Sequence, residues 1–424
     1  MSDIKKYYTE PIYRNSIGII LFQISGSLLG FIFWVITAHV ISSREIGLAT
    51  AAISAATLIT NFSKFGIDVG LVRYLPQVKD KNVLYSTVLI VTTILALAFA
   101  VIFLLFLNII SPSLTFLLDF ALLIMFVSYV ILTSITTMQN TTLITYRKSN
   151  LVVLQNIILG VRIPLILLIS SFGVLSIFFS LDVTFLIGLL INTLILYKYG
   201  TKFILRVDII TFKEIIGFSL GNYTAGIFSL IPTTIIPIMI INTLGAEQNA
   251  YFYIAYTFAG VLLMIPSSIT MALFVEGSHN LPVKSNVFKS IKLISLILIP
   301  AVIFVFLFGD KLLLLFGKEY ANNAFNLLKL LAISSLFSSV TLIYLSIKKI
   351  KKDIKILNIM NCISCIFTCL TGYIMLVNYG LIGLGYSWLI TNFLLCVITI
   401  YIIIKYEHWI NSSLIKTFKS RSVN

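Results

Sequence analysis

The most constraining feature of this chain is a series of apolar runs, each long enough to cross a lipid bilayer. A membrane-spanning helix needs about 20 apolar residues, and the chain of 424 residues is 59% hydrophobic but only 11% charged. The sequence therefore predicts an all-α polytopic membrane protein, with no room for a separate soluble ATPase domain. Its twelve predicted transmembrane helices span residues 16–41, 46–66, 83–107, 113–137, 151–171, 174–197, 214–242, 247–272, 289–309, 325–347, 354–377 and 380–404.

The distribution of basic residues predicts the orientation of these spans. Of the 30 Lys and Arg residues, 25 lie before the first span, in the even-numbered loops or at the span ends that border them, or in the C-terminal tail. The odd-numbered loops hold only Arg44, Lys311 and Lys318. Because cytoplasmic loops are enriched in Lys and Arg, both termini are predicted to be cytoplasmic, in a cell (plasma or inner) membrane. The net charge of +15 is then explained by cytoplasmic loops that face anionic lipid headgroups, and no nucleic-acid partner is expected.

The two halves of the chain resemble each other, which predicts an internal repeat. Ser16-Ile17-Gly18 opens the first span, and Ser219-Leu220-Gly221 opens the seventh. Six spans is an even number, so the halves are expected to be parallel repeats. We therefore expect two six-helix bundles, at residues 1–200 and 201–424, around a central cavity. Gly26-x-x-x-Gly30 in the first span indicates a backbone that can bend.

Motifs for catalysis or cofactor binding are not found in the sequence. There is no G-x-x-x-x-G-K-[ST] phosphate loop and no H-E-x-x-H zinc motif. The four cysteines lie in apolar stretches, where small side chains pack helix against helix. We expect a protein that is not an enzyme and that uses no cofactor and no metal.

Three stretches together resemble a known family. Residues 42–77 carry an E-x-G turn, a helix of small residues and an F-G-x-x-x-G-L-x-R-Y-x-P exit. Residues 315–334 carry an F-G-x-E-Y-x-x-A turn, and residues 377–393 carry a Y-G-x-x-G hairpin. This pattern is similar to the polysaccharide biosynthesis flippases of the O-antigen type. They belong to the multidrug/oligosaccharidyl-lipid/polysaccharide exporter superfamily.

The resemblance implies a function and a partner. The implied activity is the flipping of a polyprenyl-diphosphate-linked oligosaccharide from the cytoplasmic to the outer leaflet by alternating access. It also implies two bundles around a lumen, and coupling to an ion such as a proton or sodium. The physics agrees, because a diphosphate-sugar headgroup cannot cross about 30 Å of hydrocarbon without a polar path.

Other functions remain open. An ion-coupled multidrug antiporter of the same superfamily would need acids in its lumen. The N-terminal half offers Asp119 and Asp182, whereas the predicted spans 7–12 hold no acid in their interiors, because Glu214 and Glu247 are the first residues of spans 7 and 8. A major-facilitator transporter usually has a basic cluster closing its second loop, and FGIDVGLVRYLPQVKDK at 65–81 lacks it. A non-transporting scaffold of a polysaccharide assembly complex is the remaining alternative.

Lys64, Asp68 and Arg73 form one candidate substrate site at the predicted cytoplasmic end of the second span. One interpretation is a set of solvated interfacial charges. The other is that Lys64 and Arg73 meet the incoming diphosphate while Asp68 orients one of them. Arginine suits this role because its planar guanidinium can bind phosphate oxygens in a bidentate manner.

Arg162 and Asp182 form a second candidate site, within the membrane. Arg162 lies in the middle of the span 151–171, where a guanidinium costs at least ~2.5 kcal/mol unless it faces a partner or a wet cavity. Asp182 lies at equal depth on the next span, since both are about ten residues from the turn at 172–173. Either the two form a structural ion pair, or Arg162 binds the substrate diphosphate and Asp182 holds or releases it.

Overall fold

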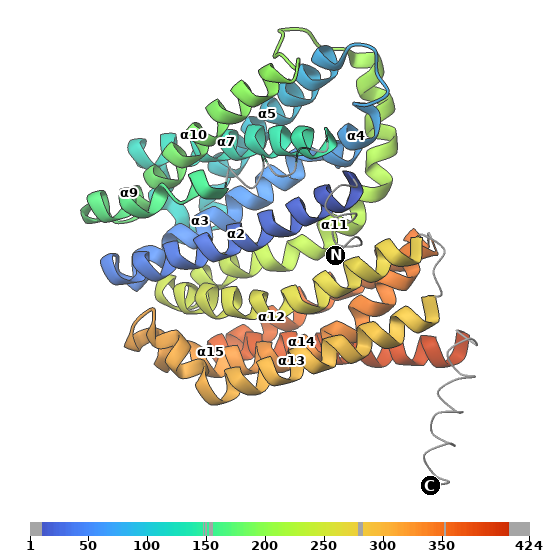
Figure 1. Cartoon of the computed structure of the whole chain (residues 1–424). Helices are drawn as coiled ribbons and strands as arrows, with labels where there is room; N and C mark the ends of the chain where they lie inside the picture. Colours follow the sequence, from blue (N-terminus) through green and yellow to red (C-terminus); the bar gives the residue numbers. More distant parts are fainter. Residues whose placement is uncertain are drawn as a thin grey trace, which may run out of the picture. The chain divides into compact units, whose positions relative to one another are not determined.

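The computed structural model describes residues 11–146, 148, 151, 156–278, 283–351 and 353–406, and within these ranges every regular element is a helix (Figure 1). The helices of the N-terminal part are α2 (Pro11–Val40), α3 (Ser43–Lys64), α4 (Ile67–Tyr74), α5 (Lys81–Leu105), α6 (Leu107–Ile110), η1 (Pro112–Leu118), α7 (Phe120–Thr145), α9 (Arg162–Ile169), η2 (Ser170–Phe172) and α10 (Val174–Lys198). They are followed by α11 (Ile209–Thr243), α12 (Ala246–Ser278), α13 (Val283–Leu314), α14 (Lys318–Ile350) and α15 (Ile354–Tyr406).

The predicted spans fall on these helices, except that the fourth, 113–137, begins in the 3-10 helix η1, and its α-helix α7 starts at Phe120 and continues to Thr145. In the part of the chain that the structure describes, nine helices are long and apolar enough to cross a membrane. One of them, α15, holds two predicted spans, because its backbone leaves helical geometry at Gly380 (φ 63°, ψ −149°). The shorter apolar helices Ser25–Val40 and Asn156–Phe172 correspond to the first and fifth spans. The chain is thus a multi-pass, all-α membrane protein, as predicted; residues 1–10, 152–155 and 407–424 lie outside the described residues.

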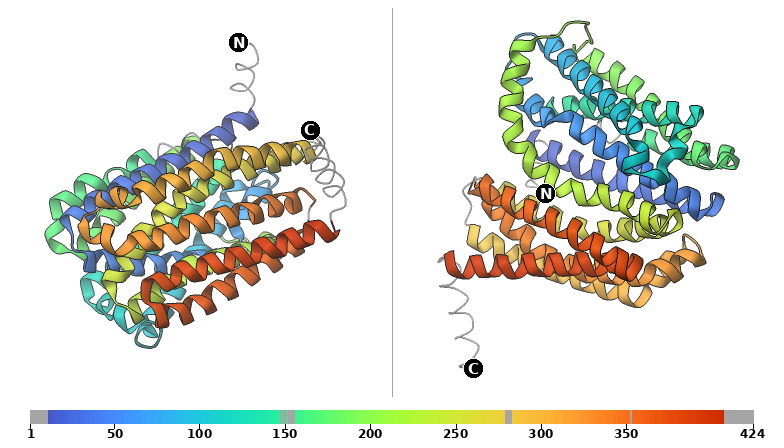
Figure 2. Two further views of the ribbon diagram at one scale, coloured as in Figure 1. Left: turned by 90° about the horizontal axis from the view of Figure 1, so that it is seen from below. Right: turned by 180° about the vertical axis from the view of Figure 1, so that it is seen from behind.

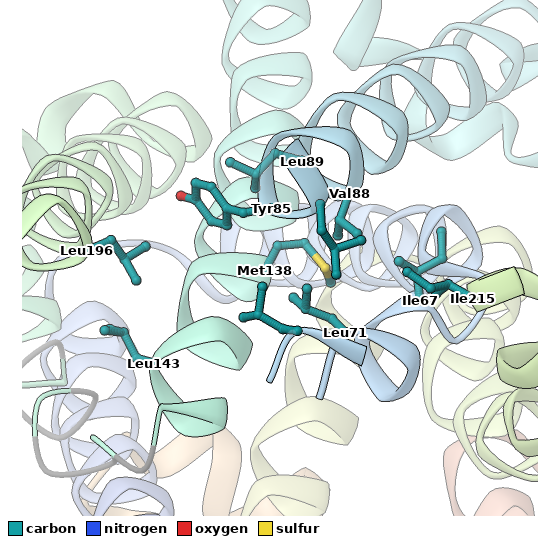
Figure 3. Close-up of a cluster of buried hydrophobic side chains, with 11 residues drawn as sticks. Ile67, Leu71, Tyr85, Val88, Leu89, Met138, Leu143, Leu196 and Ile215 are labelled. Atoms are coloured by element: carbon teal, nitrogen blue, oxygen red, sulfur yellow. The ribbon is translucent and has the colours of Figure 1, made fainter. Parts of the chain in front are cut away.

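The contacts divide the chain into two units, Met1–Ala250 and Tyr251–Asn424. The internal repeat predicts two bundles, at residues 1–200 and 201–424, and this division remains a prediction. By its contacts, however, α11 belongs to the first unit rather than to the second. A buried cluster explains why: Ile215 of α11 packs with Ile67 and Leu71 of α4, and this cluster continues to α5, α7 and α10 (Figure 3).

Helix α3 carries the E-x-G motif and lies at the centre of the first unit. Ser42 is its N-cap: Ser42 Oγ accepts from the Glu45 N–H and donates to Glu45 Oε2 (2.8 Å), a reciprocal cap of the first turn. Gly47 lets α3 approach the first turn of α12, since a β-carbon there would lie 1.6 Å from the Ala246 carbonyl oxygen. Asn249 closes this contact by donating to the Gly47 carbonyl oxygen (2.8 Å).

The second unit contains most of α12 together with α13, α14 and α15, which lie alongside one another (Figure 2). Trp388 of α15 packs against Phe252 and Tyr256 of α12, with ring centres 6.2 and 5.4 Å apart. After the turn at Gly380, Gly383 makes the close return possible: a β-carbon on it would lie 2.0 Å from the Met375 carbonyl oxygen. The Y-G-x-x-G motif is therefore a tight helical hairpin.

Candidate substrate-binding residues

The end of α3 creates the first candidate site. Phe65 and Gly66 both have positive φ (44° and 74°), so the chain turns sharply there and starts α4. Gly66 and Gly70 bring α4 against α11, because β-carbons on them would lie 2.8 Å from the Ser219 carbonyl oxygen and 2.4 Å from Ile215 Cγ2. The F-G-x-x-x-G motif is thus a close helix contact. Beside it lies a pocket of about 160 Å³ lined by Asn61, Lys64, Gly66, Asp68, Val69, Tyr223, Gly226, Ile227 and Leu230.

Lys64 and Asp68 come together in this pocket, as the sequence suggested. Lys64 Nζ donates to Asn61 Oδ1 (3.2 Å), while Asp68 lies in the first turn of α4. Asp68 Oδ1 accepts from the Val69 N–H (2.9 Å), and a carboxylate at a helix N-terminus is stabilised by the helix dipole. Lysine offers three donors to an anion. The pocket therefore presents one cation that an anionic group can reach.

Arg73 lies elsewhere. It is exposed near the end of α4, with its guanidinium carbon 5.8 Å from the centre of the Tyr74 ring, and it does not line the pocket. Of the three residues proposed for this site, the structure brings two together and leaves the third on the surface.

Arg162 begins α9 and faces α2. Its guanidinium carbon lies 4.7 Å from the centre of the Phe33 ring, and its Nη2 lies 3.5 Å from where a Gly30 β-carbon would be. One turn earlier on α2, a β-carbon on Gly26 would lie 3.0 Å from the side chain of Asn156, which donates to Ser25 Oγ (2.9 Å). Gly26 and Gly30 therefore make room for polar side chains of the Asn156–Phe172 helix. This role differs from the one that the sequence indicated, which was a backbone that can bend at these glycines.

Asp182 is buried between α10 and α7, with 7% of its surface exposed. Its Oδ2 accepts a hydrogen bond from Ser128 Oγ of α7. Asp182 makes no ion pair among the described residues. The predicted pairing of Arg162 with Asp182 is therefore not formed: Arg162 turns to α2 and Asp182 turns to α7.

Some polar residues of these sites were not singled out from the sequence. Asn61 and Tyr223 line the pocket with Lys64, and Ser25 and Asn156 lie near Arg162. The signal for Asn156 was available, because an amide within an apolar span needs a partner in lipid. No sequence signal pointed to Tyr223, because its hydroxyl donates to the backbone carbonyl oxygens of Asn61 and Phe62 (3.1 and 3.2 Å) on another helix.

Comparisons with known proteins agree with this fold. A model of the family described as "Polysaccharide biosynthesis protein" matches residues 12–274. No curated protein matches the chain. The lipid II flippase MurJ in an inward closed conformation has a TM-score of 0.74 at 14% identity, and the match covers 91% of this chain and 87% of that chain.

Two further structures come from the MOP superfamily. An inward-facing multidrug resistance transporter of the MATE family has a TM-score of 0.67 at 16% identity, covering 96% of this chain and 100% of that one. A MOP transporter from Pyrococcus furiosus has a TM-score of 0.65 at 15% identity, covering 92% and 93%. At these identities the likeness concerns the fold, which this chain shares over nearly its whole length.

Proposed function

Because the chain belongs to the polysaccharide biosynthesis protein family, as its motifs predicted, we propose that it is a membrane flippase. Its cargo is a polyprenyl-diphosphate-linked oligosaccharide, moved from the cytoplasmic to the outer leaflet by alternating access during cell-surface polysaccharide synthesis. The protein resides in the cell membrane with both termini in the cytoplasm, and a proton or sodium gradient drives it. It performs no covalent chemistry on its cargo.

The observation that carries this proposal is the position of Arg162. A guanidinium lies within an apolar helical segment, over Phe33 and close to Gly30, with a polar Ser25–Asn156 contact on the same two segments. A cation at such depth is costly unless it serves a function. An anionic diphosphate is the cargo that a guanidinium recognises best, whereas a cationic drug would be repelled.

Lys64, Asp68 and Arg73 complete the proposed path at its cytoplasmic end. Arg73 is exposed and makes the first contact with the diphosphate. Lys64 then receives one phosphate in the pocket, exchanging its bond to Asn61 for a charge-assisted one. Asp68 stays at the N-terminus of α4 and keeps the Lys64 side chain oriented.

The proposal is tested by depleting the protein and measuring the leaflet in which lipid-linked glycan accumulates. We expect accumulation in the cytoplasmic leaflet and its reversal by the intact chain. Arg162→Gln is expected to abolish the reversal, while Lys64→Gln and Arg73→Gln weaken it. The matched control is Lys329→Gln, which removes another cation over a phenylalanine ring (3.9 Å from Phe325) and should restore export normally. Unchanged glycan distribution on depletion would contradict the proposed function.

A double variant separates binding from structure at Arg162. Arg162→Leu combined with Asp182→Leu removes both charges at once, and both folded protein and export are measured. If abundance is kept and export is lost, Arg162 is the substrate cation. If both abundance and export are kept, the binding role is rejected.

One observation favours a second candidate, the ion-coupled multidrug antiporter. Asp182 is a buried carboxyl with no ion pair among the described residues, and such a group can hold a coupling cation or a cationic drug. The discriminating experiment measures efflux of cationic dyes from cells that express the chain or its Asp182→Asn variant. Efflux that depends on Asp182 supports the antiporter, and its absence together with glycan accumulation supports the flippase.

A further inference from the structure

The segment that joins α10 to α11 is held in an extended conformation against the side of α5. Backbone N–H groups of Lys202, Ile204 and Asp208 donate to Asn82 Oδ1, Ser86 Oγ and Thr87 Oγ1, at 2.8, 2.8 and 2.9 Å. These three acceptors lie on the first two turns of α5. The connection is therefore a fixed strap rather than a free loop (Figure 1).

The strap leaves a row of apolar side chains uncovered. Phe203, Leu205, Val207 and Ile209 are 52%, 93%, 43% and 62% exposed, respectively. Phe203, Leu205 and Val207 lie between the residues whose N–H groups are bound to α5, and Ile209 begins α11; all four side chains remain exposed. Exposed apolar side chains in a contiguous row mark a binding surface.

Basic and aromatic residues flank this row. Lys198, Lys202 and Arg206 are exposed, and Lys202 Nζ lies 4.8 Å from the centre of the Tyr197 ring. Tyr199, which is 44% exposed, stacks in the same way under Lys148 (4.9 Å). Tyrosine with lysine is the combination that membrane proteins place at the level of lipid headgroups.

The depth of the strap fits the same level. Asn82 to Thr87 covers about 8 Å along α5 at 1.5 Å per residue, beginning at the end of a helix that is apolar enough to cross the membrane. The headgroup layer on each side of the hydrocarbon core is about 5–8 Å thick. A segment at this depth meets the headgroup-proximal part of the acyl chains on its apolar side and phosphates at its cations.

We propose that residues 197–209 form an interfacial anchor that binds an anionic phospholipid surface. Phe203, Leu205 and Val207 enter the boundary between headgroups and acyl chains, and Lys202 and Arg206 contact lipid phosphates. The anchor holds the end of α10 and the start of α11 at the membrane surface. It goes beyond the proposed flippase activity and does not depend on the identity of the cargo.

The test places tryptophan at Leu205 in the full chain and reconstitutes it in nanodiscs that contain phosphatidylglycerol with brominated acyl chains. The matched control is Lys79→Trp, an exposed loop position before α5. The fluorescence added at residue 205, relative to the parent chain, is expected to be quenched by bromine, and that at residue 79 to be retained. Val207→Trp serves as a second probe if Leu205→Trp does not yield monodisperse protein.

The role of charge is tested with Lys202→Gln and Arg206→Gln together in the Leu205→Trp chain. Quenching should fall in nanodiscs with brominated phosphatidylglycerol, and the Leu205→Trp probe without these two changes should be quenched less in nanodiscs of equally brominated phosphatidylcholine alone. Equal fluorescence at residues 205 and 79 would overturn the anchor. Equal quenching in both lipids would overturn its preference for anionic headgroups. Neither result depends on glycan export, so the proposed function stands or falls separately.

Discussion

The glycines in the motifs of this chain lie where two helices come very close together. Gly47, Gly66, Gly70 and Gly383 each lie where a β-carbon would come within 3 Å of another backbone or side chain. Lipid provides no hydrophobic driving force between helices, so association depends on close packing and hydrogen bonds. The glycines of the E-x-G, F-G-x-x-x-G and Y-G-x-x-G motifs provide that closeness at three separate helix contacts.

Gly47→Ala tests this role most directly. The added methyl group would meet the Ala246 carbonyl oxygen at 1.6 Å and would displace Asn249 from the Gly47 carbonyl oxygen. Overpacking of this kind costs roughly 1–3 kcal/mol or more. We expect lower abundance and a lower thermal midpoint, measured by size-exclusion chromatography of heated detergent extracts.

The control for this prediction is Gly217→Ala in α11, where no atom lies within 4 Å of the added β-carbon. Alanine is favoured over glycine in a helix by about 1 kcal/mol, so this variant should be at least as stable as the parent chain. A Gly47→Ala chain with an unchanged midpoint would show that the α3–α12 contact can open without loss.

At the scale of elements, α11 connects both ends of the first unit. Near its end, Asn242 Oδ1 accepts from Ser111 Oγ (2.9 Å) and Asn242 Nδ2 donates to the Ile110 carbonyl oxygen (3.2 Å). Nearer its start, Tyr223 donates to the last turn of α3, and Ile215 packs under α4. Pro232 and Pro237 lie between these anchors, and α11 bends along its length (Figure 1).

Tyr223→Phe tests the anchor on α3. The ring remains next to Phe65 (5.9 Å between centres), but the carbonyl oxygen of Asn61 loses its donor at a helix end. A buried acceptor left without its donor costs about 1–3 kcal/mol, and the partly buried Asn61 carbonyl oxygen should lie at the low end of this range. We expect the thermal midpoint of the purified chain to fall measurably.

Tyr401→Phe is the matched control, because its hydroxyl contacts only the exposed Lys405 among the interactions that the structure shows (3.2 Å). It should leave the midpoint unchanged. If both variants behaved alike, the cap on α3 would contribute nothing to stability.

At the scale of the whole molecule, the contacts between loops agree with a chain that crosses the membrane back and forth. Arg44, Phe116 and Phe172 line one pocket of about 550 Å³, so the starts of α3 and α10 and the segment η1 share one end of the first unit. At other connections, Tyr146 meets Thr201 (2.7 Å) and Asn82 meets Lys202. The odd-numbered and even-numbered loops of the first unit thus gather separately.

Reporter fusions test the orientation that the basic residues predict. Fusions at Ser111, Phe172, Gly245 and Asn378 should report an external location, since they follow odd-numbered spans. Fusions at Asp353 and at Asn150, which lies outside the described residues, should report a cytoplasmic location. Cytoplasmic signals at two or more of the first four positions would refute the predicted topology.

The sequence by itself determined the long apolar helices and their order along the chain. Lipid offers no partner to a backbone group, so every apolar run of sufficient length must close its own hydrogen bonds as a helix. That requirement is local, so the twelve spans and the turns at Gly173 and Gly380 could be predicted from the residues alone. The family could be predicted from the sequence motifs.

Only the tertiary structure decided which side chains meet. Depth along a helix can be counted from the sequence, and it placed Arg162 and Asp182 at one level. The rotation of each helix about its axis cannot be counted, because it results from packing against all neighbours at once. That rotation turns Arg162 to Phe33 and Asp182 to Ser128. The same packing places α11 with the first unit, and a polar residue in a span takes its partner from whichever helix the packing brings beside it.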